Sequence, residues 1–88
     1  MGDVGIIYKI LPEDLEVNVE DLMKRIEEQV KDMVKIKGMQ IKPIAFGLNA
    51  ILMYIIVKDE AGITEKFEEK VKSIKGVGEI EVEEMSPI

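Results

Sequence analysis

The sequence of 88 residues predicts a single α+β domain, in which two helices pack on one face of a four-stranded antiparallel sheet. Segments with strand and helix periodicity alternate in the order strand, helix, strand, strand, helix, strand. The first and third strand segments are the most apolar, whereas the second and fourth carry the Lys, Pro and Glu residues typical of sheet edges. With right-handed crossovers, this pattern predicts a ferredoxin-like split β-α-β sandwich with strand order 4-1-3-2 over residues 1–88.

The first part of the chain predicts a strand and then a helix. Apolar residues alternate along 3–11, and Pro12 is expected to end this strand because proline has no N–H for a ladder. Residues 13–18 are acidic and lack a sustained period, which predicts a loop. Asn18 can cap a helix, and apolar residues then recur at helical spacing over 19–33.

Two strands follow on either side of Gly47. Apolar and polar residues alternate over 39–42, and Pro43 marks this strand as an edge. Residues 48–57 are almost continuously apolar, which is the pattern of a strand buried at the centre of a sheet.

The last part of the chain predicts a helix and an edge strand. Apolar residues at spacings of three and four predict a helix over 63–75, and Gly76 is placed for a left-handed C-cap. Ile80 and Val82 alternate with glutamates, so the last strand should have one buried and one acidic, solvated face, and Pro87 should stop it.

The composition argues against an enzyme. The chain has no Cys, His or Trp, which excludes disulfides, thiol nucleophiles, His general bases, Ser/His/Asp triads and zinc or haem sites built on Cys or His. The glutamates of 79–84 alternate on one strand and predict a solvated edge, not a cation site. We therefore expect no catalytic residue, no bound metal and no organic cofactor.

The compartment expected from the sequence is the cytoplasm. No apolar stretch approaches the ~18 residues of a membrane span, and the N-terminus has no basic region or cleavage site of a signal peptide. The high charge, with only two Asn and two Gln, is typical of a thermophile's protein.

The charge of the chain is unevenly distributed. The net charge is −6, and residues 1–32 and 59–88 each hold nine acids and four bases. Residues 33–58 hold no acid and four lysines, namely Lys35, Lys37, Lys42 and Lys58. This basic segment is either a partner surface or the protection of an edge strand against aggregation.

The open face of the predicted sheet carries a small apolar patch. If the alternate residues from Ile51 onward face the helices, then Leu52, Tyr54 and Ile56 point away from them, next to Ile7 and Lys9. The patch is either ordinary surface or a contact for a partner or a second copy of the chain.

The fold itself leaves the function open. An RNA-recognition domain needs stacking aromatics on one face of the central strands, but Tyr8 and Tyr54 fall on opposite faces, so we expect no direct nucleic-acid contact. An acylphosphatase needs an Arg after the first strand, where this chain has only acids as charged groups. A regulatory domain that binds a small molecule or RNA remains the alternative function.

One segment is more specific than these patterns. It reads Lys42-Pro43-Ile44-Ala45-Phe46-Gly47-Leu48 and runs into Ala50-Ile51. This stretch resembles the Pro-Ile-Ala-Phe-Gly-Leu segment of elongation factor 1-beta, the nucleotide exchange factor of archaeal and eukaryotic translation, and residues 1–4 and 74–82 are similar to the archaeal form. The resemblance implies a ferredoxin-like fold, elongation factor 1-alpha as partner, and an activity that speeds GDP release so that GTP can rebind.

The same resemblance implies where the partner binds. It points to five residues, Lys42, Pro43, Ala45, Phe46 and Gly47. Phe46 lies between two small neighbours, so its ring is expected to project as an anchor. Alternatively, Pro43 and Gly47 only shape the bend, and Phe46 packs in the core. Eukaryotic members carry a Lys near the C-terminus that reaches the partner's Mg²⁺ site, but residues 83–88 contain no Lys, so that role is assigned to no residue here.

Overall fold

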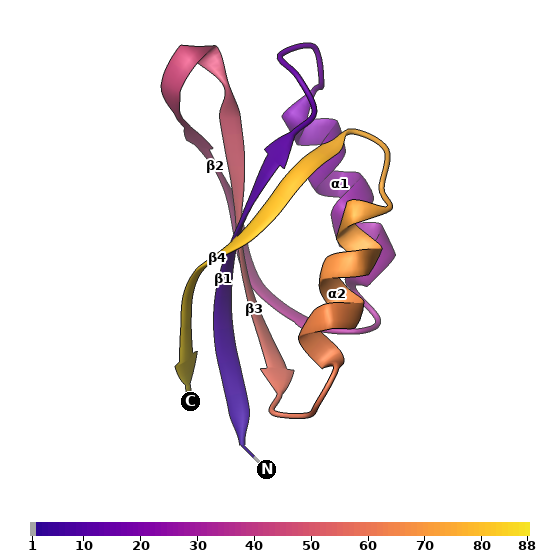
Figure 1. The fold of residues 1–88 in the computed structure, drawn as a ribbon, viewed down its shortest axis with the longest axis vertical. Coiled ribbons are helices and arrows are strands. Elements are labelled where there is room, and N and C mark those ends of the chain that lie inside the picture. The colour runs from indigo at the N-terminus through magenta and orange to yellow at the C-terminus, as the bar shows by residue number, and fades with distance from the viewer. Residues whose placement is uncertain (1) are drawn as a thin grey trace.

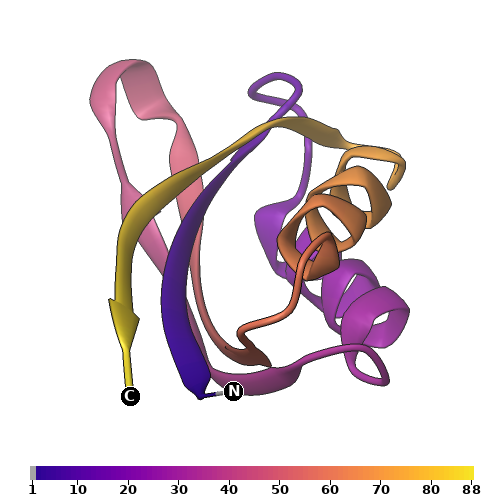
Figure 2. The same ribbon diagram turned by 60° about the horizontal axis from the view of Figure 1, so that its bottom comes forward.

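The computed structural model describes residues 2–88 and has the predicted order of elements (Figure 1). These are β1 (Asp3–Pro12), α1 (Val19–Val30), β2 (Lys35–Pro43), a short 3₁₀ turn η1 (Ala45–Gly47), β3 (Asn49–Lys58), α2 (Ile63–Lys72) and β4 (Val77–Pro87). The strands form one antiparallel sheet in the order β2-β3-β1-β4, which is the predicted order read from the other edge. Both helices cover the same face of this sheet (Figure 2), so the predicted fold is confirmed.

The core lies between the sheet and the helices. Alternate residues of β1 and β3 are fully buried, as the alternation predicted, and they meet the apolar faces of α1 and α2. The fully buried set comprises Ile6, Tyr8, Ile10, Leu22, Ile26, Val30, Ala50, Ile51, Met53, Ile55, Phe67 and Val71. The ring centroids of Tyr8 and Phe67 lie 5.0 Å apart, so these two aromatics join the centre of the sheet to α2.

One polar group reaches into this core. The Tyr8 hydroxyl donates a hydrogen bond of 2.8 Å to Oε2 of Glu68 on α2. Burial is the main reason that the pKa of Tyr8 is raised well above its usual range, and the bond and negative charge of Glu68 raise it further.

Both helices end earlier than the periodicity predicted. Asn18 caps α1 as expected, since its side chain accepts a bond of 3.1 Å from the Asp21 N–H. However, α1 ends at Val30 and not at residue 33, because the chain turns there towards β2. Similarly, α2 ends at Lys72 and not at residue 75, where the Ser73 hydroxyl donates to the Lys70 carbonyl.

The strands also extend beyond their predicted limits. β2 begins at Lys35, four residues earlier than predicted, and contains an irregularity at Ile36–Gly38 that the alternation did not reveal. Pro12 and Pro87 end β1 and β4 as predicted, and each is itself the last residue of its strand, where a missing N–H interrupts little of the ladder.

The predicted buried face of β4 is confirmed only in part. Ile80 is buried, whereas Val82 remains 44% exposed. The second half of β4 lies away from the helices (Figure 2), and an edge strand has no neighbouring strand to cover its outer side. No helix within residues 2–88 is long and apolar enough to cross a bilayer.

Candidate functional site

A closed turn joins β2 to β3 at one end of the molecule (Figure 1). The last strand pair is Pro43 with Asn49, and beyond it the Ile44 N–H donates to the Leu48 carbonyl at 2.8 Å. The Leu48 N–H in turn donates to the Ala45 carbonyl at 3.3 Å. Backbone bonds therefore fix the connection that contains the sequence motif.

Phe46 sits at the tip of this turn in a strained conformation. Its φ of 61° and ψ of 29° are left-handed, and it is the one non-glycine residue with positive φ in the described range 2–88. The side chain is 93% exposed. The prediction that the ring projects is therefore confirmed, and the alternative that it packs in the core is wrong.

The other predicted site residues surround Phe46. Gly47 follows it with φ 78°, which glycine adopts without steric cost, so Gly47 does shape the bend. Pro43 and Ala45 are exposed beside it, and Lys42 is exposed near the end of β2, opposite Ala50. The structure thus brings all five residues together, and their contact with a partner stays a prediction.

A second loop lies at the same end of the molecule and was not singled out by the sequence. It connects β1 to α1, and both views place it beside the β2–β3 turn (Figures 1 and 2). The position that a Cβ would take on Gly47 lies 3.9 Å from Cδ2 of Leu15 in this loop. Leu15 is 65% exposed, and its one sequence signal is that it is a leucine between two acids, Asp14 and Glu16, in an aperiodic segment.

A hollow of about 540 Å³ opens beside this loop. Its lining comprises Pro12, Glu13, Asp14, Leu15, Glu16 and Leu48. Leu48 directly follows the strained turn, so the hollow is continuous with the base of the motif.

The basic segment 33–58 does not form a compact patch. Lys35 and Lys37 lie on β2 and Lys58 ends β3, so the lysines spread along the sheet, and only Lys42 stands near the turn. β2 is an edge strand, as the edge-protection interpretation requires. Attraction of a partner by Lys42 remains a prediction.

The opposite edge holds an ion pair that the sequence did not predict. Nζ of Lys9 lies 2.8 Å from Glu81 and 3.4 Å from Glu83, because Lys9 pairs with Glu81 in the β1–β4 ladder. The hydrogen bond with Glu81 and its charge are the main reasons that the pKa of Lys9 is raised. The negative charges of two of the four glutamates of β4, Glu81 and Glu83, are therefore partly neutralised by Lys9 of the neighbouring strand β1.

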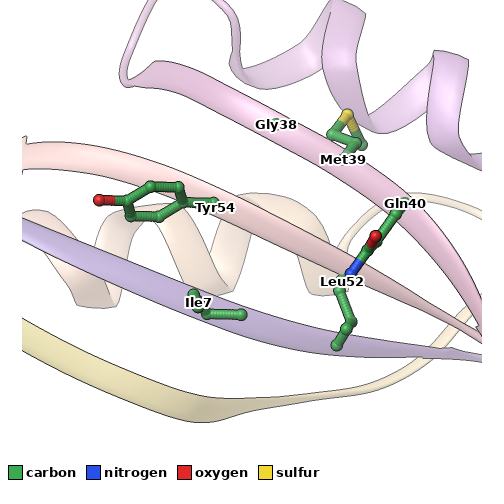
Figure 3. Close-up of a pocket in the computed structure, with 6 residues that line it drawn as sticks. All are labelled: Ile7, Gly38, Met39, Gln40, Leu52 and Tyr54. Atoms are coloured by element: carbon green, nitrogen blue, oxygen red, sulfur yellow. The ribbon is translucent and has the colours of Figure 1, made fainter.

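The open face of the sheet has the predicted arrangement and a shallow hollow of about 330 Å³ (Figure 3). Tyr54 pairs with Ile7 and Leu52 with Lys9, while their chain neighbours face the helices. The ring of Tyr54 covers Gly5, because a Cβ on that glycine would lie 3.0 Å from the ring. Self-association through this face stays a prediction.

The described residues offer several surfaces on which a partner could bind. Across residues 2–88 no three acidic side chains converge as a metal site would require. The features that stand out are the exposed aromatic on its fixed turn, the neighbouring leucine and the hollow beside them.

Solved structures of similar fold support the architecture. The ACT domain from GTP pyrophosphokinase of Chlorobium tepidum superposes with a TM-score of 0.66 at 16% identity and covers 91% of this chain and 97% of that one. A de novo designed protein superposes with a TM-score of 0.64 at 24% identity, with 96% of each chain covered. At these identities the likeness shows the fold alone, which is α+β and ferredoxin-like.

Sequence relatives are more informative. The elongation factor 1-beta of Staphylothermus marinus is 40% identical over 84 residues, which cover 94% of this chain and 93% of that protein. The elongation factor 1-beta of Thermoplasma acidophilum is 36% identical over 88 residues and covers both chains completely. The sequence profile of the EF-1 guanine nucleotide exchange domain matches residues 5–88. The chain therefore belongs to the elongation factor 1-beta family of translation nucleotide exchange factors.

Proposed function

We propose that this chain binds elongation factor 1-alpha in the cytoplasm and speeds its release of GDP, so that GTP can rebind. The observation that carries the proposal is Phe46, an aromatic that is 93% exposed on a fixed, left-handed turn inside an exchange domain. Backbone strain of this kind clusters at binding sites, where the surrounding structure maintains it.

The exchange itself needs no catalytic side chain. It needs contacts that favour the nucleotide-free GTPase over the GDP-bound one, and such coupling is reciprocal. Weakening the affinity of the GTPase for GDP by ~10³-fold requires ~4 kcal/mol of differential contact energy. The contacts supply it by displacing the partner elements that hold the phosphates and Mg²⁺. A chain without His or Cys can act in this way.

The closed turn supports an anchor role because it is already ordered. Binding normally costs about 0.5–1.5 kcal/mol for each flexible side chain that becomes fixed, and mobile loops add to this cost. Here the bonds of Ile44 and Leu48 hold the backbone in place, and Phe46 has few rotatable bonds. Most of the energy of burying the ring is therefore available for binding.

The test is the rate of GDP release from elongation factor 1-alpha, followed with a fluorescent GDP analogue. The parent chain should accelerate release, and Phe46→Ala should reduce the acceleration by about tenfold to thirtyfold, which matches a contact of about 1.4–2 kcal/mol. The melting temperature should change little, because the ring is exposed.

Two results would refute the proposal. One is a parent chain that leaves GDP release unchanged. The other is a folded Phe46→Ala protein that exchanges nucleotide at the parent rate, since this would remove the site from the β2–β3 turn. Tyr54→Phe, on the open face of the sheet, is a control that should retain the parent rate because it leaves the turn intact.

A further inference from the structure

We propose that Leu15 is a second apolar anchor for elongation factor 1-alpha, and that the hollow between Leu15 and Leu48 receives a side chain of that partner. The proposal rests on the proposed function and extends its contact surface from the β2–β3 turn to the β1–α1 loop. It follows from three observations: the loop is fixed, its leucine is exposed, and it adjoins the turn that carries Phe46.

The loop is held at several points. The Glu13 N–H donates to the Gly76 carbonyl at 2.9 Å, which attaches the start of the loop to the chain that leads into β4. Within the loop, the Glu16 N–H donates to Oδ1 of Asp14 at 2.9 Å. Gly78 packs against the backbone of Pro12 so closely that a Cβ there would lie 2.7 Å from the Pro12 oxygen. Leu15 is therefore exposed on a supported loop.

Leu15 and Phe46 belong to one surface. The backbone of Gly47, next to Phe46, approaches the Leu15 side chain, since a Cβ there would lie 3.9 Å from Cδ2. Leu48 follows Gly47 and lines the hollow together with Leu15. A partner that buries the Phe46 ring therefore meets Leu15 and this hollow, because anchors commonly cluster near the centre of an interface.

The charge of the surface indicates the kind of partner. Residues 13–16 contain three acids, and within the described chain none of the three forms an ion pair. A second copy would bring the same acidic loop and a net charge of −6, and anionic lipids or nucleic acids would be repelled as well. The occupant we infer is an apolar side chain of elongation factor 1-alpha, with basic residues of that protein around it.

The experiment measures both the exchange rate and the affinity for nucleotide-free elongation factor 1-alpha. Leu15→Ala should lower each by about fivefold to tenfold and should leave the melting temperature unchanged, because an exposed side chain contributes little to the core. Leu15→Met should restore both readouts to within about twofold, since it keeps the apolar volume. The loss should persist at high salt, unlike the loss of a charge contact.

The matched control is Val82→Ala. Val82 is also an exposed aliphatic residue, but it pairs with Tyr8 in the middle of the sheet and so lies away from the loop. Its exchange rate should equal that of the parent. Equal losses in Leu15→Ala and Val82→Ala would show a general effect of removing surface methyl groups and would overturn the assignment.

The remaining outcomes separate this inference from the proposed function. If Leu15→Ala exchanges at the parent rate while Phe46→Ala is impaired, Leu15 is not an anchor and the proposed function stands. If the parent chain does not speed GDP release, the proposed function fails. A loss in Leu15→Ala that Leu15→Met does not restore, or that follows a lowered melting temperature, would assign Leu15 a structural role instead.

Discussion

Replacing Phe46 with glycine should make the domain more stable and less active at the same time. The left-handed backbone at Phe46, with φ 61° and ψ 29°, is unfavourable for any residue that carries a Cβ. Glycine adopts it freely, so the substitution removes the strain together with the ring. Phe46→Ala removes the ring and keeps the strain, which makes it the matched control.

The expected stability change follows from three terms. Relief of the left-handed conformation contributes about 1–2 kcal/mol. The greater freedom of glycine in the unfolded chain offsets about 0.4–1 kcal/mol of this. Little packing is lost, because the ring is 93% exposed. The net gain therefore lies between about 0 and 1.6 kcal/mol, and its midpoint of about 0.8 kcal/mol corresponds to a rise of about 3–6 °C in melting temperature for a domain of this size.

The activity should change in the opposite direction. Both Phe46→Gly and Phe46→Ala should slow exchange by about tenfold to thirtyfold, because both lack the ring. Circular dichroism during heating gives the melting temperatures, and release of fluorescent GDP gives the rates. A glycine variant that melts well below the parent would show that the ring stabilises the fold, and unequal activities of the two variants would show that backbone flexibility also contributes.

Three further predictions concern charge, pH and close packing. Lys42→Glu should lower the on-rate for elongation factor 1-alpha more than it raises the off-rate, and the effect should shrink with added salt, since salt screens exposed charges that are more than ~8–10 Å apart. Stopped-flow on-rates that change neither with salt nor with the substitution would leave Lys42 with the role of edge protection alone. Because burial and Glu68 raise the pKa of Tyr8, the unfolded chain loses this proton near pH 10 before the folded one does, so stability should fall as the pH rises above 10. Tyr8→Phe should lower the free energy of unfolding by about 1–2 kcal/mol at neutral pH, and its melting temperature should fall less between pH 8 and 11 than that of the parent. Melting temperatures that fall in parallel for the two proteins would show that Tyr8 is not the group responsible. Gly78→Ala should destabilise the domain by about 1–3 kcal/mol in denaturant unfolding, since its Cβ would meet the Pro12 oxygen at 2.7 Å, and an unchanged midpoint would show that β1 and β4 can separate there without cost.

The periodicity of the sequence was sufficient for the topology and insufficient for the ends of the elements. Apolar spacing continues through Ile74, which is half-buried, although the helix ends at Lys72. A side chain can face the core from a turn as well as from a helix, so burial at helical spacing does not mark the last helical residue. Pro12 likewise tolerates strand geometry because its ladder is irregular at that point.

Contacts between distant segments could not be predicted, because they depend on register. The pairing of Lys9 with Glu81, the bond of Tyr8 to Glu68 and the approach of Gly47 to Leu15 each join residues more than thirty positions apart. A shift of one residue in a strand would reverse the face of every side chain in it. The exposure of Phe46, in contrast, had a local signal in its small neighbours and was predicted correctly.

The position of the candidate surface explains how the fold can maintain strain there. A domain of 88 residues has a total stability of roughly 4–13 kcal/mol, so a cost of about 1–2 kcal/mol at Phe46 is a considerable share. The fully buried residues lie between the sheet and the two helices, whereas the strained turn and the Leu15 loop lie at one end of the molecule (Figure 1). Changes at this end therefore remove little of the packing that holds the fold. The strain contributes nothing to the core, so we attribute its persistence to the position that it gives the Phe46 ring. Loss of the ring should therefore slow nucleotide exchange, whereas relief of the strain should raise the free energy of unfolding.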